Sequence, residues 1–411
     1  MVSRYPLWES LIPPSQYGRP DRCAVAAEGT RVQFANGGWA LCATSGLWNV
    51  NLGYGNRAIA DAIASTLATA SYLTLFRGGH RLAVLAANAL LAVCGREHFG
   101  RVLFSTSGGA ANDVMTKLVR HYQTLRGEQR RRIVVGLKGS YHGLTYGSFA
   151  LTGERLGQEF YGVDQRAVRH VDHRDETELA ALLAREGHRV AAVVLEPVLG
   201  SGAYPVSDRL LGSLHELRRE HGFLLVADEV ATGFGRTGRF FASQGWPVRP
   251  DVLITSKGLT NGTCAASAVV VSHEVCTIFE RKDAVLVHGE TQAGTPSSCA
   301  AILATIQEME RLDACARAVQ NSIRLDDLLE RLSVHPLVSG YRGAGCFRAL
   351  QLSVPGVSPL VIAAARRAGV VVQPGLDCVQ LVPALIYGDS EFAELATHLV
   401  TALDQVAEKA A

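Results

Sequence analysis

The sequence lacks several features that would place it in a specialised class. Its nine cysteines form no C-x-x-C pair and do not alternate with histidines, which argues against a zinc site and against a disulfide framework. Its 40 basic and 38 acidic side chains leave a net charge of +2, whereas a nucleic-acid binder would show a clustered basic surface. We therefore expect no metal site, no nucleic-acid partner, and reduced thiols of the kind found in cytoplasmic proteins.

Long hydrophobic runs are also absent. The longest nearly apolar stretch, residues 82–93, contains an asparagine and is too short to cross a bilayer. The first residues have no apolar signal-peptide region, so we expect no secretion signal, no membrane partner and a cytoplasmic location. With 48% hydrophobic and 19% charged residues, the composition is typical of a core-forming globular protein. A length of 411 residues predicts two or three domains.

Lysine is scarce compared with arginine. This scarcity leaves a short list of candidate amine nucleophiles, which comprises Lys117, Lys138, Lys257, Lys282 and Lys409. A lysine that lies beside a buried strand is therefore a conspicuous feature of this chain.

Short apolar runs rich in β-branched residues alternate with longer helical patterns. Runs that are apolar on both faces are typical of a parallel sheet buried between helices. The alternation predicts an α/β fold with βαβ crossovers. The predicted strands are residues 101–104, 133–137, 190–197, 223–229, 251–256 and 266–272, and the clearest helices between them are residues 111–126 and 207–222.

The two ends of the chain differ from its centre. The beginning is rich in turns, with a strand-like piece at residues 30–38, and the end is helical at residues 300–312 and 321–332 before short strands and a last helix. We expect residues 48–296 to form a large α/β domain. Residues 1–47 and 297–411 are predicted to combine into a smaller α+β domain.

Charged residues end two successive predicted strands. One strand ends in Asp228 and Glu229 and the next in Ser256 and Lys257, at the sheet edge where open α/β folds bind ligands. A lone aspartate often caps a helix, and an exposed lysine is normally a solvated charge. A lysine partly desolvated at a sheet edge, however, has the lowered pKa that a Schiff-base amine needs. A carboxylate for the ring nitrogen and an amine for the aldehyde are the pair that pyridoxal phosphate requires.

Two further turns follow predicted strands. Ser107, Gly108 and Gly109 open a helix, and backbone N–H groups at a helix N-terminus suit a phosphate dianion. Tyr141 and His142 follow the strand at 133–137 and place an aromatic ring at the same edge. Taken singly, a glycine-rich turn relieves strain, a tyrosine packs and a histidine bonds within a core. Four strands that each end in a complementary group favour a cofactor site.

At this point the chain resembles a known family. It is similar to the class III (ω-type) aminotransferases of the fold-type I pyridoxal-phosphate family over nearly its whole length. The resemblance implies a large domain with a mostly parallel seven-stranded sheet between helices, and a homodimer with shared active sites. The strings that carry it lie at residues 45–56, 104–113, 141–143, 196–202, 227–238, 255–262 and 290–296.

The resemblance also implies residue roles. Lys257 would be the Schiff-base lysine and Asp228 the partner of the pyridinium nitrogen. Tyr141 and Val230 would pack on the two ring faces, and Leu47 and Trp48 would line the substrate pocket. Further cofactor-binding residues would be Ser107, Gly108, Gly109, His142 and Glu196, together with Thr291 from the other subunit.

The chain departs from the family pattern in three places. Gly109 replaces a hydroxyl residue and Ala110 a carboxylate, and the usual proline after the lysine turn is absent. Near the C-terminus, the family reads a substrate carboxylate with an arginine at one of two positions, and this chain has Gln373 and Gln380 there. A glutamine offers neutral hydrogen bonds in place of a charged fork. Alternatively, another arginine takes over the role, with Arg77, Arg342 and Arg348 as candidates.

The sequence argues against several other functions. Residues 233–238 match G-x-G-x-x-G, but the preceding strand ends in carboxylates that would repel a pyrophosphate, and no helix is predicted after them. The chain has no G-x-S-x-G element of a serine hydrolase. A non-catalytic binding module would be expected to have lost Lys257 or Asp228. Aminomutases, racemases and decarboxylases of the same fold stay open, because they share the cofactor motifs.

The sequence therefore predicts an aminotransferase with small-molecule substrates, an amino donor and an oxo acceptor. The acceptor would be a ketone or aldehyde that need not carry an α-carboxylate. The two glutamines would suit a natural-product pathway, such as that of aminotransferases resembling those of daptide-type peptide clusters, which aminate a peptide C-terminus.

Overall fold

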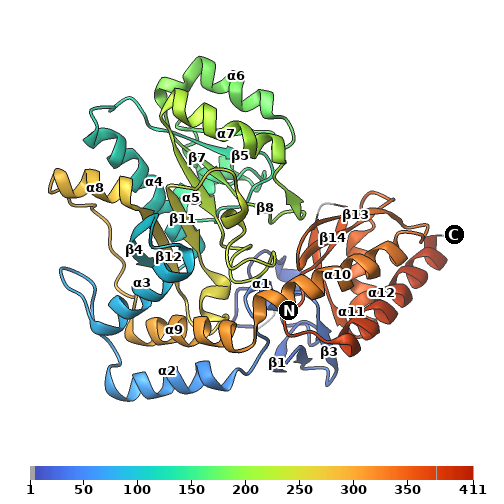
Figure 1. Cartoon of the computed structure of the whole chain (residues 1–411). Helices are drawn as coiled ribbons and strands as arrows, with labels where there is room; N and C mark the ends of the chain where they lie inside the picture. Colours follow the sequence, from blue (N-terminus) through green and yellow to red (C-terminus); the bar gives the residue numbers. More distant parts are fainter. Residues whose placement is uncertain (1–4, 376, 411) are drawn as a thin grey trace.

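A seven-stranded sheet forms the centre of the larger part of the molecule (Figure 1). The computed structural model describes residues 5–375 and 377–410. The sheet has the order β4-β12-β11-β10-β7-β5-β6, and β12 alone runs antiparallel to its neighbours. Its strands are β4 (Phe99–Ser105), β5 (Ile133–Leu137), β6 (Val168–Val171), β7 (Val190–Leu195), β10 (Leu224–Asp228), β11 (Val252–Thr255) and β12 (Ser267–Ser272).

The mostly parallel seven-stranded sheet predicted from the sequence is confirmed. All six strands expected from apolar runs are present, and each end lies within two residues of its predicted position. The additional strand, β6, had no such signal. Its sequence VRHV carries Arg169 and His170, and it lies at the sheet edge, where burial on both faces is not required.

Helices cover both faces of this sheet. Along β10, Leu224 and Val226 pack toward α4 (Gly108–Leu125) and α8 (His273–Arg281), whereas Leu225 packs toward α6 (Glu176–Glu186) and α7 (Asp208–His221). On β11 and β12, Leu253 and Val270 face a third cluster. That cluster includes residues of α2 (Arg57–Thr69), α3 (Arg81–Cys94) and α9 (Pro296–Arg311). The alternation of faces explains why the strands are apolar throughout.

Capping residues set both ends of α7 and the start of α4. The side chain of Ser207 accepts the N–H of Leu210, and Gly222 ends α7 with φ +68°, as the sequence predicted. Helix α4 begins three residues before its apolar pattern. Its start is set by Ser107, whose hydroxyl oxygen accepts the N–H of Ala110 at 3.1 Å.

The smaller part combines the two ends of the chain. In one sheet, β3 (Trp39–Cys42) pairs with β15 (Val370–Val371) in parallel, with Leu41 opposite Val370. The domain boundaries at residues 47 and 296 stay a prediction. The other elements of this part are β1 (Ala24–Glu28), β2 (Arg31–Phe34), β13 (Val338–Ala344), β14 (Phe347–Leu352), β16 (Gln373–Gly375), β17 (Cys378–Leu381), α10 (Ala314–Leu332), α11 (Ser358–Ala368) and α12 (Asp389–Ala410).

Four further short elements belong to the fold. They are α1 (Ser45–Trp48), α5 (Tyr146–Leu151), β8 (Val198–Leu199) and β9 (Tyr204–Pro205). In the part of the chain that the structure describes, no helix is both long enough and apolar enough to span a membrane.

Candidate active site

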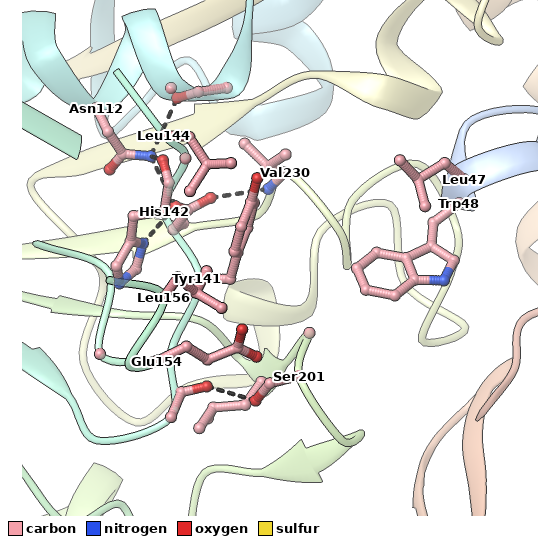
Figure 2. Close-up of a pocket in the computed structure, with 18 of the residues that line it drawn as sticks. Leu47, Trp48, Asn112, Tyr141, His142, Leu144, Glu154, Leu156, Ser201 and Val230 are labelled. Carbon is pink, nitrogen blue, oxygen red and sulfur yellow. Dashed lines mark hydrogen bonds and ion pairs between the residues drawn. The ribbon is translucent and has the colours of Figure 1, made fainter. Parts of the chain in front are cut away.

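The carboxyl ends of five strands meet at one edge of the sheet. Strand β12 is antiparallel to both β4 and β11, so β4, β11, β10, β7 and β5 all point the same way. A cavity of about 1170 Å³ opens at this edge (Figure 2). The predicted site residues that line it are Leu47, Trp48, Ser107, Gly108, Gly109, Tyr141, His142, Asp228, Val230, Lys257, Gln373 and Gln380.

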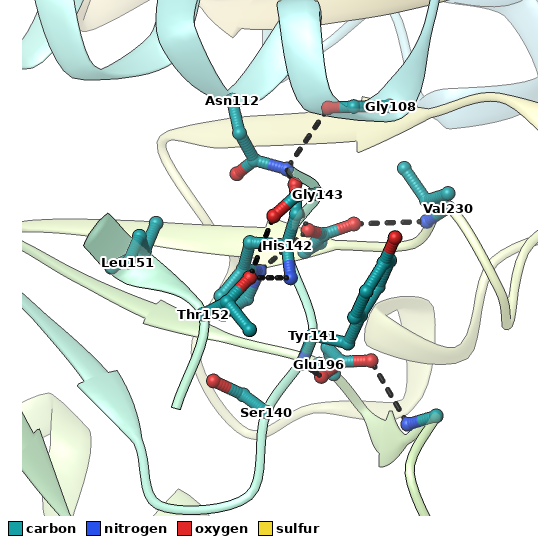
Figure 3. A network of polar contacts seen from close by, with 12 residues as sticks. Gly108, Asn112, Ser140, Tyr141, His142, Gly143, Leu151, Thr152, Glu196 and Val230 are labelled. Carbon is teal, nitrogen blue, oxygen red and sulfur yellow. Dashed lines mark hydrogen bonds and ion pairs between the residues drawn. The ribbon is translucent and has the colours of Figure 1, made fainter. Parts of the chain in front are cut away.

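Asp228 ends β10 on the face that packs against α4. Its Oδ2 accepts the side-chain N–H of Asn112 at 2.9 Å and lies 2.7 Å from Nδ1 of His142, and its Oδ1 accepts the N–H of Val230 at 3.1 Å (Figure 3). Burial disfavours the charged imidazole, but the hydrogen bond and charge of Asp228 outweigh it and raise the pKa of His142. Asp228 itself is 2% exposed, so these donors stabilise a buried carboxylate.

Glu229, the second carboxylate of this pair, does not reach the cavity. It points into the protein, where its oxygens accept the N–H of Ser243 at 2.6 Å and the hydroxyl of Thr232 at 2.5 Å. The strand's two-residue alternation explains the difference, because neighbouring residues face opposite sides. Asp228 is therefore the carboxylate that a ligand meets at the end of β10.

Lys257 begins a short 3₁₀ turn after β11. Its φ is +48°, an uncommon value for a residue with a side chain and one that concentrates at functional sites. The Nζ lies 5.1 Å from the ring centroid of Trp48. Burial lowers the pKa of Lys257, against the opposing charges of Asp228 and Glu196. The amine is thus nearer to its neutral, nucleophilic form than a surface lysine.

Two glycines with close neighbours begin α4, directly after the capping residue Ser107. A Cβ at Gly108 would lie 3.0 Å from Cγ1 of Val230, and one at Gly109 would lie 3.2 Å from Oγ of Ser148. Gly143, with φ +122°, approaches so closely that a Cβ there would lie 2.5 Å from the Cα of Gly109. The N–H groups of the first helical turn lie outside the helix ladder and suit an anion.

Glu196 lies behind the cavity wall. Its carboxylate accepts the N–H of Tyr141 at 2.8 Å and the N–H of Gly200 at 3.0 Å. Burial raises the pKa of Glu196 to about 7. Since it does not line the cavity, its contacts indicate that it positions the backbone of Tyr141, whose ring stands next to Val230 in Figure 2.

The two glutamines lie side by side on the cavity wall. Gln373 of β16 and Gln380 of β17 are cross-strand partners. Nε2 of Gln380 donates to the carbonyl of Gly200 at 2.9 Å, whereas its buried Oε1 has no hydrogen-bond partner. The two positions at which the family places an arginine are therefore one neutral patch.

The three arginines proposed as substitutes lie outside the cavity lining. Arg342 donates to the carbonyl of Gly202 at 2.7 Å and covers the ring of Tyr204 at 3.9 Å. Arg348 pairs with Asp326 at 2.8 Å. Among the described residues that line the cavity, the one arginine is Arg155, which is exposed.

Thr291 also lies outside its own chain's cavity. It is exposed, and its carbonyl accepts the hydroxyl of Tyr72 at 3.0 Å. The role of Thr291 in the phosphate site of the other subunit stays a prediction.

Several polar residues of the cavity were not predicted from the sequence, among them Asn112, Glu154 and His173. Asn112 stands four residues after Gly108, one helical turn into α4, so helical spacing could have indicated it. Glu154 and His173 lie on loops after α5 and β6, where no strand-end pattern applies.

Residues 233–238 have a structural role here. Arg236 is fully buried and donates to Oδ1 of Asn51 at 2.5 Å and to the carbonyl of Pro383. It therefore joins the segment after α1 to the C-terminal part. No helix starts in this turn, whereas a dinucleotide-binding element opens one.

The comparisons with known proteins agree on one family. The family model described as aminotransferase class-III matches residues 14–403. The chain is 34% identical to acetylornithine aminotransferase of Mycolicibacterium smegmatis, over 98% of each chain. It is 29% identical to putrescine–pyruvate aminotransferase of Pseudomonas aeruginosa, over 94% of this chain and 91% of that protein. An amine transaminase of an uncultivated Pseudomonas species, solved with pyridoxal phosphate bound, has a TM-score of 0.92 at 28% identity, covering 99% of this chain and 100% of that chain.

The fold and the strand-edge site define a fold-type I transaminase. The chain belongs to the class III aminotransferases, as its motifs predicted, and its cofactor is pyridoxal 5′-phosphate. The described residues fit this cofactor. Lys257 supplies an amine with a lowered pKa, and Asp228 supplies a buried carboxylate with three hydrogen-bond donors. The N-terminus of α4 offers backbone N–H groups to the phosphate, and a Cβ at Gly108 or Gly109 would crowd the neighbouring side chains there.

Proposed function

We propose that this class III aminotransferase moves an amino group from an amino donor to a ketone or aldehyde that need not carry an α-carboxylate. The observation that carries the proposal is the neutral patch of Gln373 and Gln380 on the cavity wall. A bidentate, charge-assisted contact to a carboxylate needs a guanidinium, which neither residue supplies. Arg155, at the exposed rim, lacks the buried setting that strengthens such a contact.

The proposed roles follow from the contacts. When bound, the cofactor supplies an aldehyde that takes up amines and a ring that stabilises a carbanion. Lys257 would hold the aldehyde and would move the proton that transamination relocates. Asp228, fixed by Asn112 and His142, would keep the ring nitrogen protonated. Further roles are phosphate binding by Ser107, Gly108 and Gly109, contact with the ring by Tyr141 and Val230, and lining of the substrate pocket by Leu47 and Trp48.

We further propose a homodimer in which Thr291 completes the phosphate site of the other subunit. Exposed apolar side chains near Thr291 support it, because the ring of Phe76 packs against Gly289, and Val287 is 81% exposed two residues before that glycine. Sedimentation should show a dimer at assay concentration. A fully active monomer would contradict this part of the proposal.

The same neutral wall supports a specialised, natural-product acceptor with neutral flanks, such as a peptide-like aldehyde. Some relatives are named for keto acids, among them the putrescine–pyruvate aminotransferase, so the acceptor must be tested directly. The test compares kcat/KM for pyruvate and 2-oxoglutarate with that for matched ketones that lack the carboxylate. A preference for the keto acids above about 100-fold, or about 2.7 kcal/mol, would contradict the proposal.

A second measurement separates transamination from its alternatives. An aminotransferase must convert the cofactor to its amine form with a donor and return it with an acceptor, whereas a mutase, racemase or decarboxylase releases no oxo product from the donor. Absorbance of the cofactor in single half-reactions therefore distinguishes them.

A further inference from the structure

Arg236 carries a buried charge that the proposed roles leave unused. It is the largest fully buried side chain among the described residues, and its guanidinium bonds uncharged oxygens. One nitrogen, Nη1, donates to the carbonyl of Pro383. The other, Nη2, donates to Oδ1 of Asn51 at 2.5 Å and to Oγ of Ser45 at 3.3 Å. Burial lowers the pKa of Arg236 to about 10, so it stays charged at neutral pH. Burying a charge against neutral groups is costly, which directs attention to what its bonds hold.

These bonds reach two segments that carry cavity residues. Ser45 lies three residues before Trp48, and Pro383 lies three residues after Gln380. Both Trp48 and Gln380 line the cavity, whereas Arg236 is not part of its lining. Arg236 therefore connects two walls of the cavity from behind. We call the following residues the arginine anchor: Arg236, Ser45, Asn51 and Pro383.

Two further hydrogen bonds join the same segments directly. The hydroxyl of Ser45, which accepts from Arg236, donates to the carbonyl of Val382 at 2.7 Å. The N–H of Val382 donates to the carbonyl of Ala43 at 2.7 Å. The chain before Trp48 is thus fastened to the chain after β17 on both sides of residue 44.

The segment held in this way has a strained backbone. The φ angles are +47° at Ser45, +71° at Gly46 and +61° at Trp48. A side-chain-bearing residue keeps such an angle only where its surroundings fix it, and such residues cluster at functional sites. Figure 2 shows Leu47 and Trp48 on the side of the cavity opposite to His142. If the bonds to Ser45 are removed, the segment can relax and Trp48 can move.

Arg236 also supports Trp48 through its backbone. The ring of Trp48 packs on Phe347, with 5.0 Å between the centroids. The N–H of Cys346, the residue before Phe347, donates to the carbonyl of Arg236 at 2.8 Å. A Cβ at Gly345 would lie 2.6 Å from that carbonyl oxygen, so this turn lies directly against Arg236. The same residue therefore fixes the chain that carries Trp48 and the ring that Trp48 packs on.

We propose that Arg236 is a positioning residue for substrate size, which holds Trp48 against the wall that carries Gln380 and so sets the width of the substrate pocket. This inference rests on the proposed function in one respect, the assignment of Trp48 to the substrate pocket. It concerns the shape of the pocket, and it holds whether or not the acceptor carries a carboxylate. Arg236 acts through Ser45 and through the backbone, because it does not line the cavity itself.

The test compares half-reactions of the holoenzyme with 1-phenylethylamine and with the bulkier 1-(1-naphthyl)ethylamine, followed by cofactor absorbance. Ser45→Ala removes the hydroxyl that accepts from Arg236 and donates to Val382. The rate at low substrate for the bulkier amine, relative to the smaller one, should rise by about 10-fold, since a displacement of about 1 Å changes rates by up to about 100-fold. The gain should appear as a lower half-saturation concentration for the bulkier amine, with the cofactor affinity unchanged.

Further variants bracket this effect. Arg236→Lys keeps a charge but loses the planar fork, so it should change the ratio in the same direction and further. Trp48→Gly removes the wall and sets the upper limit. Arg239→Lys, an exposed residue close to Arg236 in the sequence, and Ser213→Ala, whose hydroxyl donates within α7, are the matched controls and should keep the wild-type ratio.

A second measurement needs no turnover. Acrylamide quenching of fluorescence reports how accessible an indole ring is, and the signal of Trp48 is the difference between each holoenzyme and its Trp48→Phe version. Quenching of Trp48 should be steeper in Ser45→Ala than in the wild type and unchanged in Ser213→Ala. A hydroxyl that only adds to the stability of the fold would leave this quenching as it is in the wild type.

Each outcome decides the proposal. If Trp48→Gly changes the ratio while Ser45→Ala changes neither the ratio nor the quenching, the positioning role is overturned and the proposed function stands. If Trp48→Gly leaves the ratio unchanged, Trp48 is no wall of the substrate pocket, and that part of the proposed function fails together with the inference. If neither amine reacts with the wild type, the quenching decides, and if Arg236→Lys does not fold, Ser45→Ala decides.

Discussion

The cavity has two halves that are built differently. The half at Asp228 and Lys257, which we call the strand-edge half, is made by residues at the ends of parallel strands. Its carboxylate, that of Asp228, has three hydrogen-bond donors. The half at Glu154 and Gln380, which we call the far half, is made by loops and by strands of the smaller part, and it contains buried atoms without hydrogen-bond partners, such as Oε1 of Gln380. The strand-edge half therefore depends on where the strands of one sheet end, whereas the far half depends on loops and on the register of β16 against β17.

The largest effect should come from Lys257→Ala, which removes the amine of the strand-edge half. Turnover should fall by at least about 10⁴-fold, because both the bond to the cofactor and the proton-moving group are lost. Borohydride reduction of the wild type followed by peptide mapping should find the cofactor on Lys257. Finding it on another lysine would contradict the assignment, and Lys282→Ala, exposed on the surface, serves as the control.

Asp228→Asn should have the next largest effect. A neutral partner leaves the ring nitrogen largely unprotonated, so the half-reaction should slow by about 10³-fold, or about 4 kcal/mol. Stopped-flow absorbance measures this rate, and Asp61→Asn on the exposed face of α2 is the matched control. A rate near that of the wild type would mean that another group protonates the ring.

Much of the strand-edge half could be predicted because it depends on where strands end. Apolar runs locate β5, β10 and β11, and the polar residue that follows each run must then lie at the sheet edge. Asn112 was not predicted because its contact with Asp228 depends on how α4 packs across the sheet. The seventh strand, β6, was missed since an edge strand needs no continuous apolar run.

The far half could be predicted only in part. Family resemblance located Gln373 and Gln380, but the register of β16 on β17 is what makes them neighbours. No local pattern marks Glu154 as a cavity residue, because its position depends on the contact of Gly153 with β5 and on a loop after β8. Contacts between segments far apart in sequence leave no periodic signal in any one of them.

A third prediction concerns the pH dependence of stability in the strand-edge half. The folded protein raises the pKa of Glu196 to about 7, above the usual value of 4.5, so folding favours its protonated form. Its contribution is complete below about pH 4.5 and is lost as pH rises through about 7, by at most about 3 kcal/mol. Urea unfolding of the cofactor-free protein at several pH values should show this slope in the wild type and a smaller one in Glu196→Gln.

Asp251 provides an internal check on that experiment. Burial raises the pKa of Asp251 to about 7 as well, but it is present in both proteins, so its contribution cancels in the comparison. Equal slopes in wild type and Glu196→Gln would show that Glu196 stays ionised in the folded protein.

The smallest effect is expected from Gln373→Arg, which would make the far half resemble other family members. A new guanidinium on the cavity wall should raise kcat/KM for pyruvate relative to a matched ketone by about 10-fold. Gln307→Arg, exposed on α9, is the control for an added charge elsewhere. An unchanged ratio in Gln373→Arg would mean that position 373 does not approach the carboxylate of the substrate.

The pairing of β3 with β15 has a consequence for synthesis of the chain. Leu41 is made early, but its partner Val370 emerges near the end, after the whole central sheet. Until then one edge of β3 stays unpaired, and an open strand edge is a template for association with other chains. Because closing so long a loop is entropically costly, the smaller part should be the last to fold on the ribosome. Truncation before β15 should therefore yield a folded central sheet that aggregates through its N-terminal strands.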